Sequence, residues 1–293
     1  MRGIVTVLNT PFTTTGDIDF NDLRRTVDDA LEAGVAGFLV GGLASEVGML
    51  SEDERIRVLE TILELNDART QVIGGGFGET QADRVAVARR LIDCGCEGIM
   101  ASLPFTETAS FESNIRELAD LHPGFLMIQD WDPEGTGIPL PVIKHLFETI
   151  PEFKWLKMEI IPAGPKYTEV LNATKGQLKV AGGWAVMQMI EALDRGVHVF
   201  MPTAMYRIYC SIYSRYAEGD RESAQHLFNE ILPVLAFSNQ NLDISIQFFK
   251  RLLAAQGVFQ TDSVRIECPP FDEAQRRIAD ELIARVIAIE AEL

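Results

Sequence analysis

The sequence is poor in cysteine, histidine and positive charge, and each shortage excludes a class of function. Among its 293 residues are four cysteines and four histidines. The histidines form no HxH or HExxH pattern, so a metal site built from histidine is not expected. Lysine and arginine number 26 against 43 aspartates and glutamates, which gives a formal net charge of −17. A chain this acidic does not attract nucleic acid or an anionic membrane, so neither is an expected partner.

Long hydrophobic runs are also missing. The apolar stretch at the start ends at Asn9, which is too short for a secretory signal or a membrane span. Few cysteines and no signal predict reduced thiols and a cytoplasmic location. The pair Cys94 and Cys96 is too tight for an ordinary disulfide and lacks the two-residue spacer of common zinc sites, so packing is its expected role. A hydrophobic content of 47% is that of an ordinary globular protein with a sizeable core.

What the sequence does contain is a series of short apolar runs, spaced roughly thirty residues apart. Each run is rich in Val, Ile, Leu, Phe or Met and is bounded by glycine, proline or polar residues, as in strands that are buried on both faces. Eight strands are therefore expected, at residues 4–8, 37–41, 71–75, 98–102, 125–129, 155–159, 178–181 and 197–201.

Amphipathic segments between these runs predict helices. Examples are 20–33, which ends before Gly34, 52–65, which begins after Ser51 as N-cap, and 81–94. Eight strands that alternate with helices predict an α/β fold of the (β/α)₈ TIM-barrel type. A doubly wound sheet is the alternative, but it usually has fewer strands.

The last part of the chain has a different pattern. Helical periodicity continues at 208–218, 221–236, 242–256 and 273–293 without intervening strand signals. We therefore expect a barrel at residues 1–207 and a C-terminal helical extension at 208–293 that packs on it.

The sixth predicted strand carries the first candidate for chemistry. Reactive side chains of such barrels stand at the carboxyl ends of the strands. Alternation places Trp155, Lys157 and Glu159 on one face and Lys154 and Met158 on the other. A lysine in apolar surroundings is costly unless it is paired or neutral, and a neutral amine is the nucleophile of Schiff-base chemistry. The alternatives are a structural ion pair with Glu159, or a surface lysine on a displaced strand.

Three further places combine glycines, amides or acids at strand ends. After the second strand, the backbone amides of Ala44 and Ser45 are candidates for binding a carboxylate, although a plain turn is the alternative. After the seventh strand, Gly182 and Gly183 leave room for a ligand, with Trp184 as a possible wall of the site.

The end of the fifth strand is the third of these places. Here Gln129 and Asp130 precede an acidic loop. Either side chain is a functional candidate if it points inward. A solvated acidic loop is the alternative.

Several pieces of the chain together resemble one superfamily. In order they are TPFTTTGDIDF, GVAGFLVGGLASEVGMLSEDER, GIMASLPF, GTG, WLKME and KVAGGWAVMQMIEALDRGV. This set resembles the dihydrodipicolinate synthase and N-acetylneuraminate lyase superfamily of class I aldolases. The resemblance implies a Schiff-base role for Lys157 and a tetramer built from dimers. It implies no metal, nucleotide or organic cofactor.

The chain also departs from that superfamily at the positions where the synthases bind the substrate carboxylate and relay protons. The strand-five tyrosine corresponds to Asp130, or to Gln129 if the alignment slips by one residue. The threonine pair, the second tyrosine and the loop arginine correspond to Leu43-Ala44, Thr106 and Gly135. These replacements remove most of the expected synthase apparatus while the lysine remains.

The residues that are kept resemble a branch of 2-keto-3-deoxy sugar-acid dehydratases, in which strand five reads Gln-Asp and a glutamate follows the lysine by two residues. This resemblance implies a lyase for a small 2-keto acid, working as a tetramer or dimer. The implied catalytic residues are Lys157, Glu159, Asp130 and Gln129, and the implied substrate-binding residues are Ala44, Ser45, Thr106, Gly182 and Gly183. The alternatives are dihydrodipicolinate synthase itself and a catalytically silent barrel that senses a keto acid.

Overall fold

Eight strands close into a parallel barrel, in the order β1 to β8 around its circumference. The computed structural model describes residues 1–132 and 134–293, and the side chains of all of these except Trp184 and Ala185. Helices alternate with the strands, and further helices follow the last strand. The predicted (β/α)₈ barrel with a C-terminal helical extension is therefore confirmed.

The elements have the following bounds. The strands are β1 Gly3–Val7, β2 Gly37–Val40, β3 Gln71–Gly75, β4 Gly98–Ser102, β5 Phe125–Asp132, β6 Phe153–Ile160, β7 Lys179–Gly182 and β8 Val199–Phe200. The helices are α1 Phe20–Glu32, α2 Glu52–Asn66, α3 Gln81–Asp93, α4 Thr108–Ala119, α5 Leu140–Thr149, α6 Ala163–Ala173, α7 Met189–Asp194, α8 Tyr206–Ala217, α9 Arg221–Ser238, α10 Leu242–Ala255 and α11 Glu273–Ala291.

The chain consists of two compact units. The first contains Met1–Val5 and Gln71–Met201, and the second contains Thr6–Thr70 and Pro202–Leu293. The predicted domain boundary at residue 207 stays a prediction.

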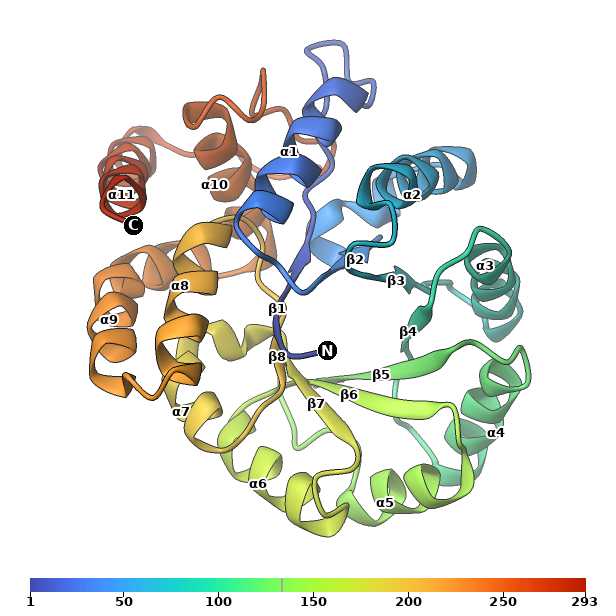
Figure 1. The fold of residues 1–293 in the computed structure, drawn as a ribbon. Helices are drawn as coiled ribbons and strands as arrows, with labels where there is room; N and C mark the ends of the chain where they lie inside the picture. The colour runs from blue at the N-terminus through green and yellow to red at the C-terminus, as the bar shows by residue number, and fades with distance from the viewer. Residues whose placement is uncertain (133) are drawn as a thin grey trace. The chain divides into compact units, whose positions relative to one another are not determined.

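In the first unit, β5 and β6 are longer than the apolar runs that predicted them. Both extend over eight residues and stay paired from Met127, opposite Trp155, to Asp132, opposite Ile160. In Figure 1 these two strands lie side by side as the longest arrows. Their added length keeps Gln129 within regular strand.

The register of these strands fixes which residues share a face. Ser102 of β4 pairs with Gln129, Gln129 with Lys157 of β6, and Lys157 with Ala181 of β7. Residues in register on parallel neighbours point to the same side of a sheet. Lys157 and Gln129 therefore belong to one row of side chains. Apolar residues fill both faces of the strands, as the sequence predicts; for example, Leu156 and Met158 are fully buried.

In the second unit, local signals in the sequence set the helix ends. Ser51 caps α2, and with Glu54 it forms a reciprocal capping box. Gly34 follows α1 with a φ of +85°, a conformation that glycine adopts without strain. The four C-terminal helices begin and end within two residues of the predicted bounds, and α8 and α9 lie side by side (Figure 1).

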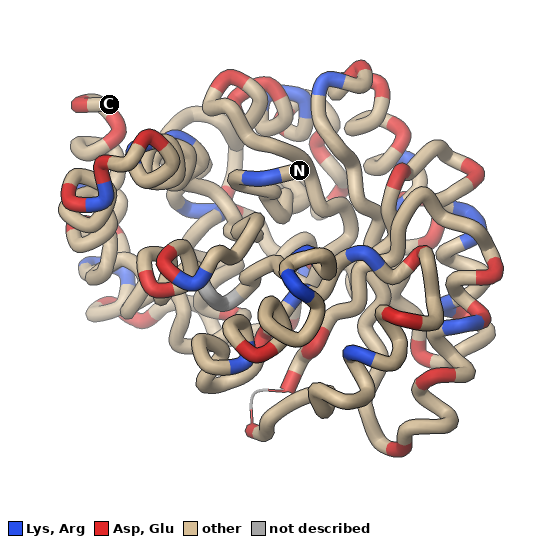
Figure 2. Tube along the Cα trace, turned by 60° about the horizontal axis from the view of Figure 1, so that its bottom comes forward, with Lys and Arg blue, Asp and Glu red and all other residues tan. Residues whose placement is uncertain are grey.

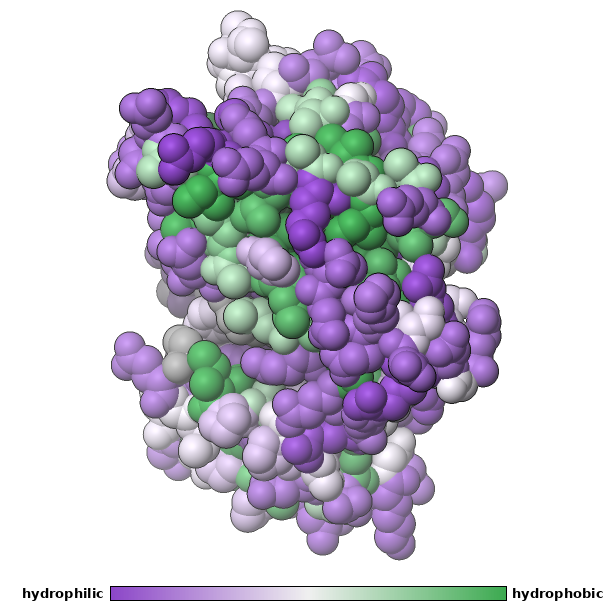
Figure 3. Space-filling model, turned by 90° about the vertical axis from the view of Figure 1, so that its left-hand side faces the viewer, coloured by the Kyte–Doolittle hydropathy of each residue, from purple (hydrophilic) through white to green (hydrophobic). Residues whose placement is uncertain are grey.

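The surface of the molecule carries the acidic excess. Acidic and basic positions are scattered over the helices, with acidic ones more frequent (Figure 2). Apolar residues gather on part of the face that includes the C-terminal helices (Figure 3). Exposed apolar side chains of these helices include Leu232 on α9 and Ile278 and Ile287 on α11. No helix within the described residues is both long and apolar enough to cross a membrane.

Candidate active site

Lys157 and Glu159 form a buried ion pair near the carboxyl end of β6. The Nζ atom of Lys157 lies 3.3 Å from Oε2 of Glu159, and the two side chains are 7% and 8% exposed. The prediction that they share a face of the strand is confirmed. Lys154 is exposed instead, and its Nζ donates to the carbonyl of Gly124 at 2.7 Å. The strand therefore presents one buried amine.

Gln129 joins this pair from the neighbouring strand. It stands in register with Lys157, and its Nε2 donates a short hydrogen bond to Oε2 of Glu159. One carboxylate oxygen of Glu159 thus faces both the ammonium of Lys157 and the amide of Gln129. This arrangement holds a single ionisable acid beside the amine, where it can receive or return a proton.

Gly183, which follows β7, lies against the side chains of Lys157 and Glu159. A methyl group on its Cα would lie 2.7 Å from Cε of Lys157 and would overlap Oε1 of Glu159. Glycine is therefore required for the close approach of Lys157 and Glu159 to the backbone. The room predicted for a ligand at this position is filled by these two side chains.

Gly182 is placed differently. It ends β7 in register with Met158, and its carbonyl accepts from the amide of Met201 at 2.9 Å. The proposed wall formed by Trp184 lies outside the described side chains.

Tyr167 is a neighbour that sequence reasoning missed. It lies on α6 and is 2% exposed, and its hydroxyl has no hydrogen-bond partner among the described residues. Burial raises the pKa of the Tyr167 phenol, and the negative charge of Glu159 raises it further. The phenol is therefore a neutral, buried donor within the electrostatic reach of Glu159. A tyrosine on a helix after the sixth strand gave no signal in the sequence.

Asp130 faces the opposite side of β5 from Gln129. Its Oδ2 lies 2.6 Å from Nζ of Lys166 on α6, and its Oδ1 accepts from the amide of Ile138 at 2.8 Å. Lys166 also donates to the carbonyl of Thr136 at 2.6 Å. Burial raises the pKa of the Asp130 carboxyl, and the charge of Lys166 opposes this shift. Asp130 thus stabilises the loop after β5. The side chain that the structure places in the cluster with Lys157 is Gln129 and not Asp130.

In the second unit, the loop after β2 contains two short 3₁₀ turns, Leu43–Ser45 and Val47–Met49. The Ser45 hydroxyl donates to the carbonyl of Leu8 at 2.6 Å, and its amide donates to the carbonyl of Gly42 at 3.0 Å. Both donors of Ser45 are therefore used within the unit, so the prediction of carboxylate binding shifts toward the Ala44 amide.

Thr106 lies in the first unit, between β4 and α4, and is exposed. Among the described residues, no contact ties its side chain to the cluster around Lys157. Its predicted role in substrate binding stays a prediction.

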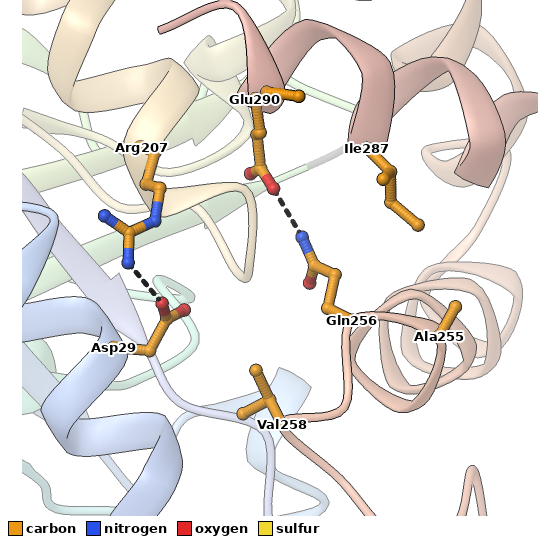
Figure 4. Close-up of a pocket in the computed structure, with 8 residues that line it drawn as sticks. Asp29, Arg207, Ala255, Gln256, Val258, Ile287 and Glu290 are labelled. Carbon is orange, nitrogen blue, oxygen red and sulfur yellow. Dashed lines mark hydrogen bonds and ion pairs between the residues drawn. The ribbon is translucent and has the colours of Figure 1, made fainter.

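A cavity of about 410 Å³ lies elsewhere in the second unit, among α1, α8, α10 and α11. Figure 4 shows its polar groups facing one another in two pairs. Arg207 lies 3.0 Å from Asp29, and Gln256 donates to Glu290 at 2.6 Å. Burial raises the pKa of both carboxyls. These pairs link α1 to α8 and α10 to α11.

The whole chain matches one known family. The model of the dihydrodipicolinate synthetase family matches residues 1–286. The chain belongs to this family. It is 32% identical over 278 residues to the 4-hydroxy-tetrahydrodipicolinate synthase of Salinibacter ruber, which covers 93% of this chain and 91% of the relative. It is 26% identical over 279 residues to the L-2-keto-3-deoxyarabonate dehydratase of Azospirillum brasilense, covering 92% and 89%.

Solved structures of the family have the same fold. The dihydrodipicolinate synthase from Rhodopseudomonas palustris superposes with a TM-score of 0.90 at 22% identity, over 97% of each chain. The predicted superfamily is thus confirmed, and so is the predicted enzyme class, because the family consists of aldolases, lyases and dehydratases. The particular substrate differs among the relatives.

Proposed function

We propose that the protein is a Schiff-base lyase that acts on a 2-keto acid, preferably a 2-keto-3-deoxy sugar acid, through Lys157. The observation that carries this proposal is the buried cluster of Lys157, Glu159 and Gln129. A buried amine beside one carboxylate can pass its proton to that acid and attack a carbonyl carbon.

The first step forms the imine. The amine of Lys157 attacks the keto carbon of the substrate, the carbonyl oxygen leaves as water, and a protonated imine remains. Its positive nitrogen accepts electrons from the adjacent carbon, so the C3–H bond becomes acidic.

Glu159 moves the protons that follow. In a dehydration it takes the C3 proton and returns it to the departing C4 hydroxyl, which leaves as a second water; hydrolysis of the imine then consumes one water, so the net loss is one. In a retro-aldol reaction it takes the proton of the C4 hydroxyl instead, and the C3–C4 bond breaks. Both routes need one general acid–base within hydrogen-bond reach of the reacting carbon.

The contacts of the two candidate carboxylates favour Glu159 over Asp130 for this role. Glu159 lies beside the amine of Lys157, whereas Asp130 is engaged by Lys166 and the amide of Ile138. Gln129, in register with Lys157, orients Glu159 and adds no second titrating group. The roles predicted from the sequence for Ala44, Ser45, Thr106, Gly182 and Gly183 in binding the substrate stay predictions.

A second candidate is the condensation of pyruvate with aspartate semialdehyde. The 32% identity to the Salinibacter enzyme favours it. The replacement of the threonine pair by Leu43-Ala44, and of the loop arginine by Gly135, counts against it.

Borohydride trapping tests the proposal and separates the candidates. The protein is incubated with pyruvate or with 2-keto-3-deoxy sugar acids, reduced, and digested for mass spectrometry. We expect a covalent adduct on Lys157, which Lys157→Ala abolishes and the control Lys154→Ala retains. Turnover only with pyruvate and aspartate semialdehyde would favour the synthase, and no adduct with any 2-keto acid would favour the binding protein.

The same proposal includes a homo-oligomer, a tetramer or dimer, in the cytoplasm. Light scattering on the purified protein measures the assembly. A mass equal to the 32.5 kDa of one chain would contradict it.

A further inference from the structure

The cavity among α1, α8, α10 and α11 has a volume of about 410 Å³, which lies in the range of small-molecule sites. All of its lining residues belong to the second unit. Its polar groups are the carboxylates of Asp29 and Glu290, the guanidinium of Arg207 and the amide of Gln256, which face one another in Figure 4. The reaction proposed above uses none of these groups.

Three helices end at this cavity. Asp29 lies in the last turn of α1, Ala255 is the last residue of α10, and Glu290 lies one residue before the end of α11. The carbonyl groups at the end of a helix carry a partial negative charge, which a lysine or arginine in the last turn ordinarily offsets. All residues of these three helices are described, and none of the helices has a basic residue in its last turn. The backbone therefore adds to the negative potential of the cavity.

The acids at the cavity outnumber the cations. Arg207 lies 3.0 Å from Asp29 and 3.4 Å from Glu32 of the same helix, so one guanidinium serves two carboxylates. Glu290 accepts a hydrogen bond from the neutral amide of Gln256 at 2.6 Å. Burial raises the pKa of the Glu290 carboxyl, and the bond from Gln256 opposes this shift only in part. The carboxylate of Glu290 is thus half-buried beside an amide and not beside a full positive charge.

Other cations of the second unit are already paired with acids of their own. Lys250 of α10 forms a short ion pair with Glu46, and both side chains are 0% exposed. Arg25 of α1, whose Nε donates to the carbonyl of Val258 at 3.0 Å, forms a short ion pair with the buried Asp22. Positive charge for the cavity therefore has to come from a ligand.

The rest of the lining is apolar. It is formed by four side chains of α10, α11 and the segment after α10, namely Ala255, Val258, Ile287 and Ala291. A bare metal ion prefers oxygen ligands on several sides, whereas an apolar wall beside carboxylates fits a cation with a hydrocarbon stem. Contact between that stem and the wall removes apolar surface from water.

We propose that this cavity binds a primary alkylammonium ion, with its ammonium group between Asp29 and Glu290 and its hydrocarbon stem against Val258 and Ile287. An ammonium group has three N–H donors and no acceptor, which matches carboxylates that lack a cation. The inference stands on the second unit alone and does not rest on the proposed function.

The test is isothermal titration calorimetry of the full-length protein with n-pentylamine, near neutral pH and at low ionic strength. We expect saturable binding with a Kd of about 1 mM, the scale for so small a ligand. Two probes with the same hydrocarbon chain separate charge from hydrophobicity. Both n-pentanol, which is neutral, and pentanoate, which is negative, should bind at least about tenfold more weakly.

Glu290→Gln removes the carboxylate and keeps its shape and an acceptor for Gln256. Because burial raises the pKa of Glu290, the folded state disfavours its charged form, so the variant should be at least as stable as the wild type in urea unfolding. We expect its Kd for pentylamine to rise about tenfold. Glu281→Gln, at an exposed position on the same helix, changes the net charge equally and is the matched control.

Ile287→Ala tests the apolar wall. We expect the Kd for pentylamine to rise about fivefold, because the stem loses part of its contact surface. Ile278→Ala is the matched control, since Ile278 and Ile287 lie on the same helix and are both 38% exposed. The control should bind pentylamine as the wild type does.

Three results would overturn the proposed site. The first is the absence of saturable pentylamine binding. The second is equal binding of pentylamine and pentanol, or wild-type affinity in Glu290→Gln, since either would show that the ammonium group is not recognised at this cavity. The third is an equal loss of affinity in Glu281→Gln, which would reduce the binding to a general attraction by the acidic surface.

Discussion

The amine of Lys157 and the carboxylate of Glu159 lie 3.3 Å apart on one face of a strand, two residues from each other. In the proposed reaction, two side chains of the same strand share the work. The lysine attacks the keto carbon, and the glutamate beside it moves protons once the imine exists.

Glu159→Gln should separate capture from turnover. Gln keeps the shape of the side chain but cannot exchange a proton, so we expect turnover to fall by about 10²–10⁴. Borohydride trapping on Lys157 should survive, because imine formation needs the amine and the keto carbon. If trapping is lost together with turnover, Glu159 is an electrostatic partner of Lys157 and not the proton carrier.

Gly183→Ala should displace the side chains of Lys157 and Glu159 while leaving their chemical groups unchanged. The new methyl group displaces Glu159 and the Lys157 chain, and overpacking of this kind costs about 1–3 kcal/mol. We expect both trapping and turnover to fall, as measured at a temperature below the unfolding transition. The control for stability is Gly48→Ala, where a methyl group meets nothing within 4 Å. Full activity in Gly183→Ala would show that the cluster tolerates displacement.

Lys166→Met should destabilise the protein strongly. It leaves Asp130 buried without a cation, and breaking a buried pair in this way costs about 3–5 kcal/mol. We expect the double variant Asp130→Asn/Lys166→Met to recover much of this loss in urea unfolding. Asp130→Asn alone should retain most of its turnover when folded. If it folds normally and is inactive, Asp130 and not Glu159 carries the proton.

His198 should make stability depend on pH in the acid range. Its ring packs edge-on against Trp155, and its Nδ1 accepts from the amide of Val180 at 3.2 Å. Burial lowers the pKa of His198 to about 4, while the unfolded chain takes up the proton near pH 6.5. The unfolded state therefore binds more protons between these values, and stability falls as the pH drops through this window.

The expected loss is about 2 kcal/mol between pH 6.5 and 4, measured by urea unfolding. His198→Gln should abolish this dependence. His226→Gln, at an exposed position on α9, is the control and should leave it in place. An unchanged slope in His198→Gln would assign the acid sensitivity to other groups.

The sequence predicted the strands well because their apolar runs are buried on both faces. It ended the fifth strand at Gln129, whereas β5 continues to Asp132, because the residues from Asp130 onward are polar and resemble a loop. Which of Gln129 and Asp130 lies next to Lys157 depends on the register between β5 and β6. That register cannot be read from the sequence. A slip of one position exchanges the inward and the outward side chain.

Lys166 and Lys250 were missed for a different reason. Each stands on a helix, where a lysine ordinarily reaches solvent, and its partner lies on a distant part of the chain. Only the folded contacts reveal that these lysines are enclosed. The one local hint that the sequence offered is at Lys250, which follows two phenylalanines, Phe248 and Phe249, and precedes Arg251.

The three side chains of the cluster, Gln129, Lys157 and Glu159, all stand within regular strands and not on the loops that follow them. The position of these three side chains therefore depends on the strands and not on the loops. Loops such as residues 103–107, after β4, can change in length or sequence while the ladder between β5 and β6 keeps the amine and the acid in place. Under the proposed function, we expect substrate preference to change, by evolution or by design, through the loops that follow the strands, while Gln129, Lys157 and Glu159 stay unchanged.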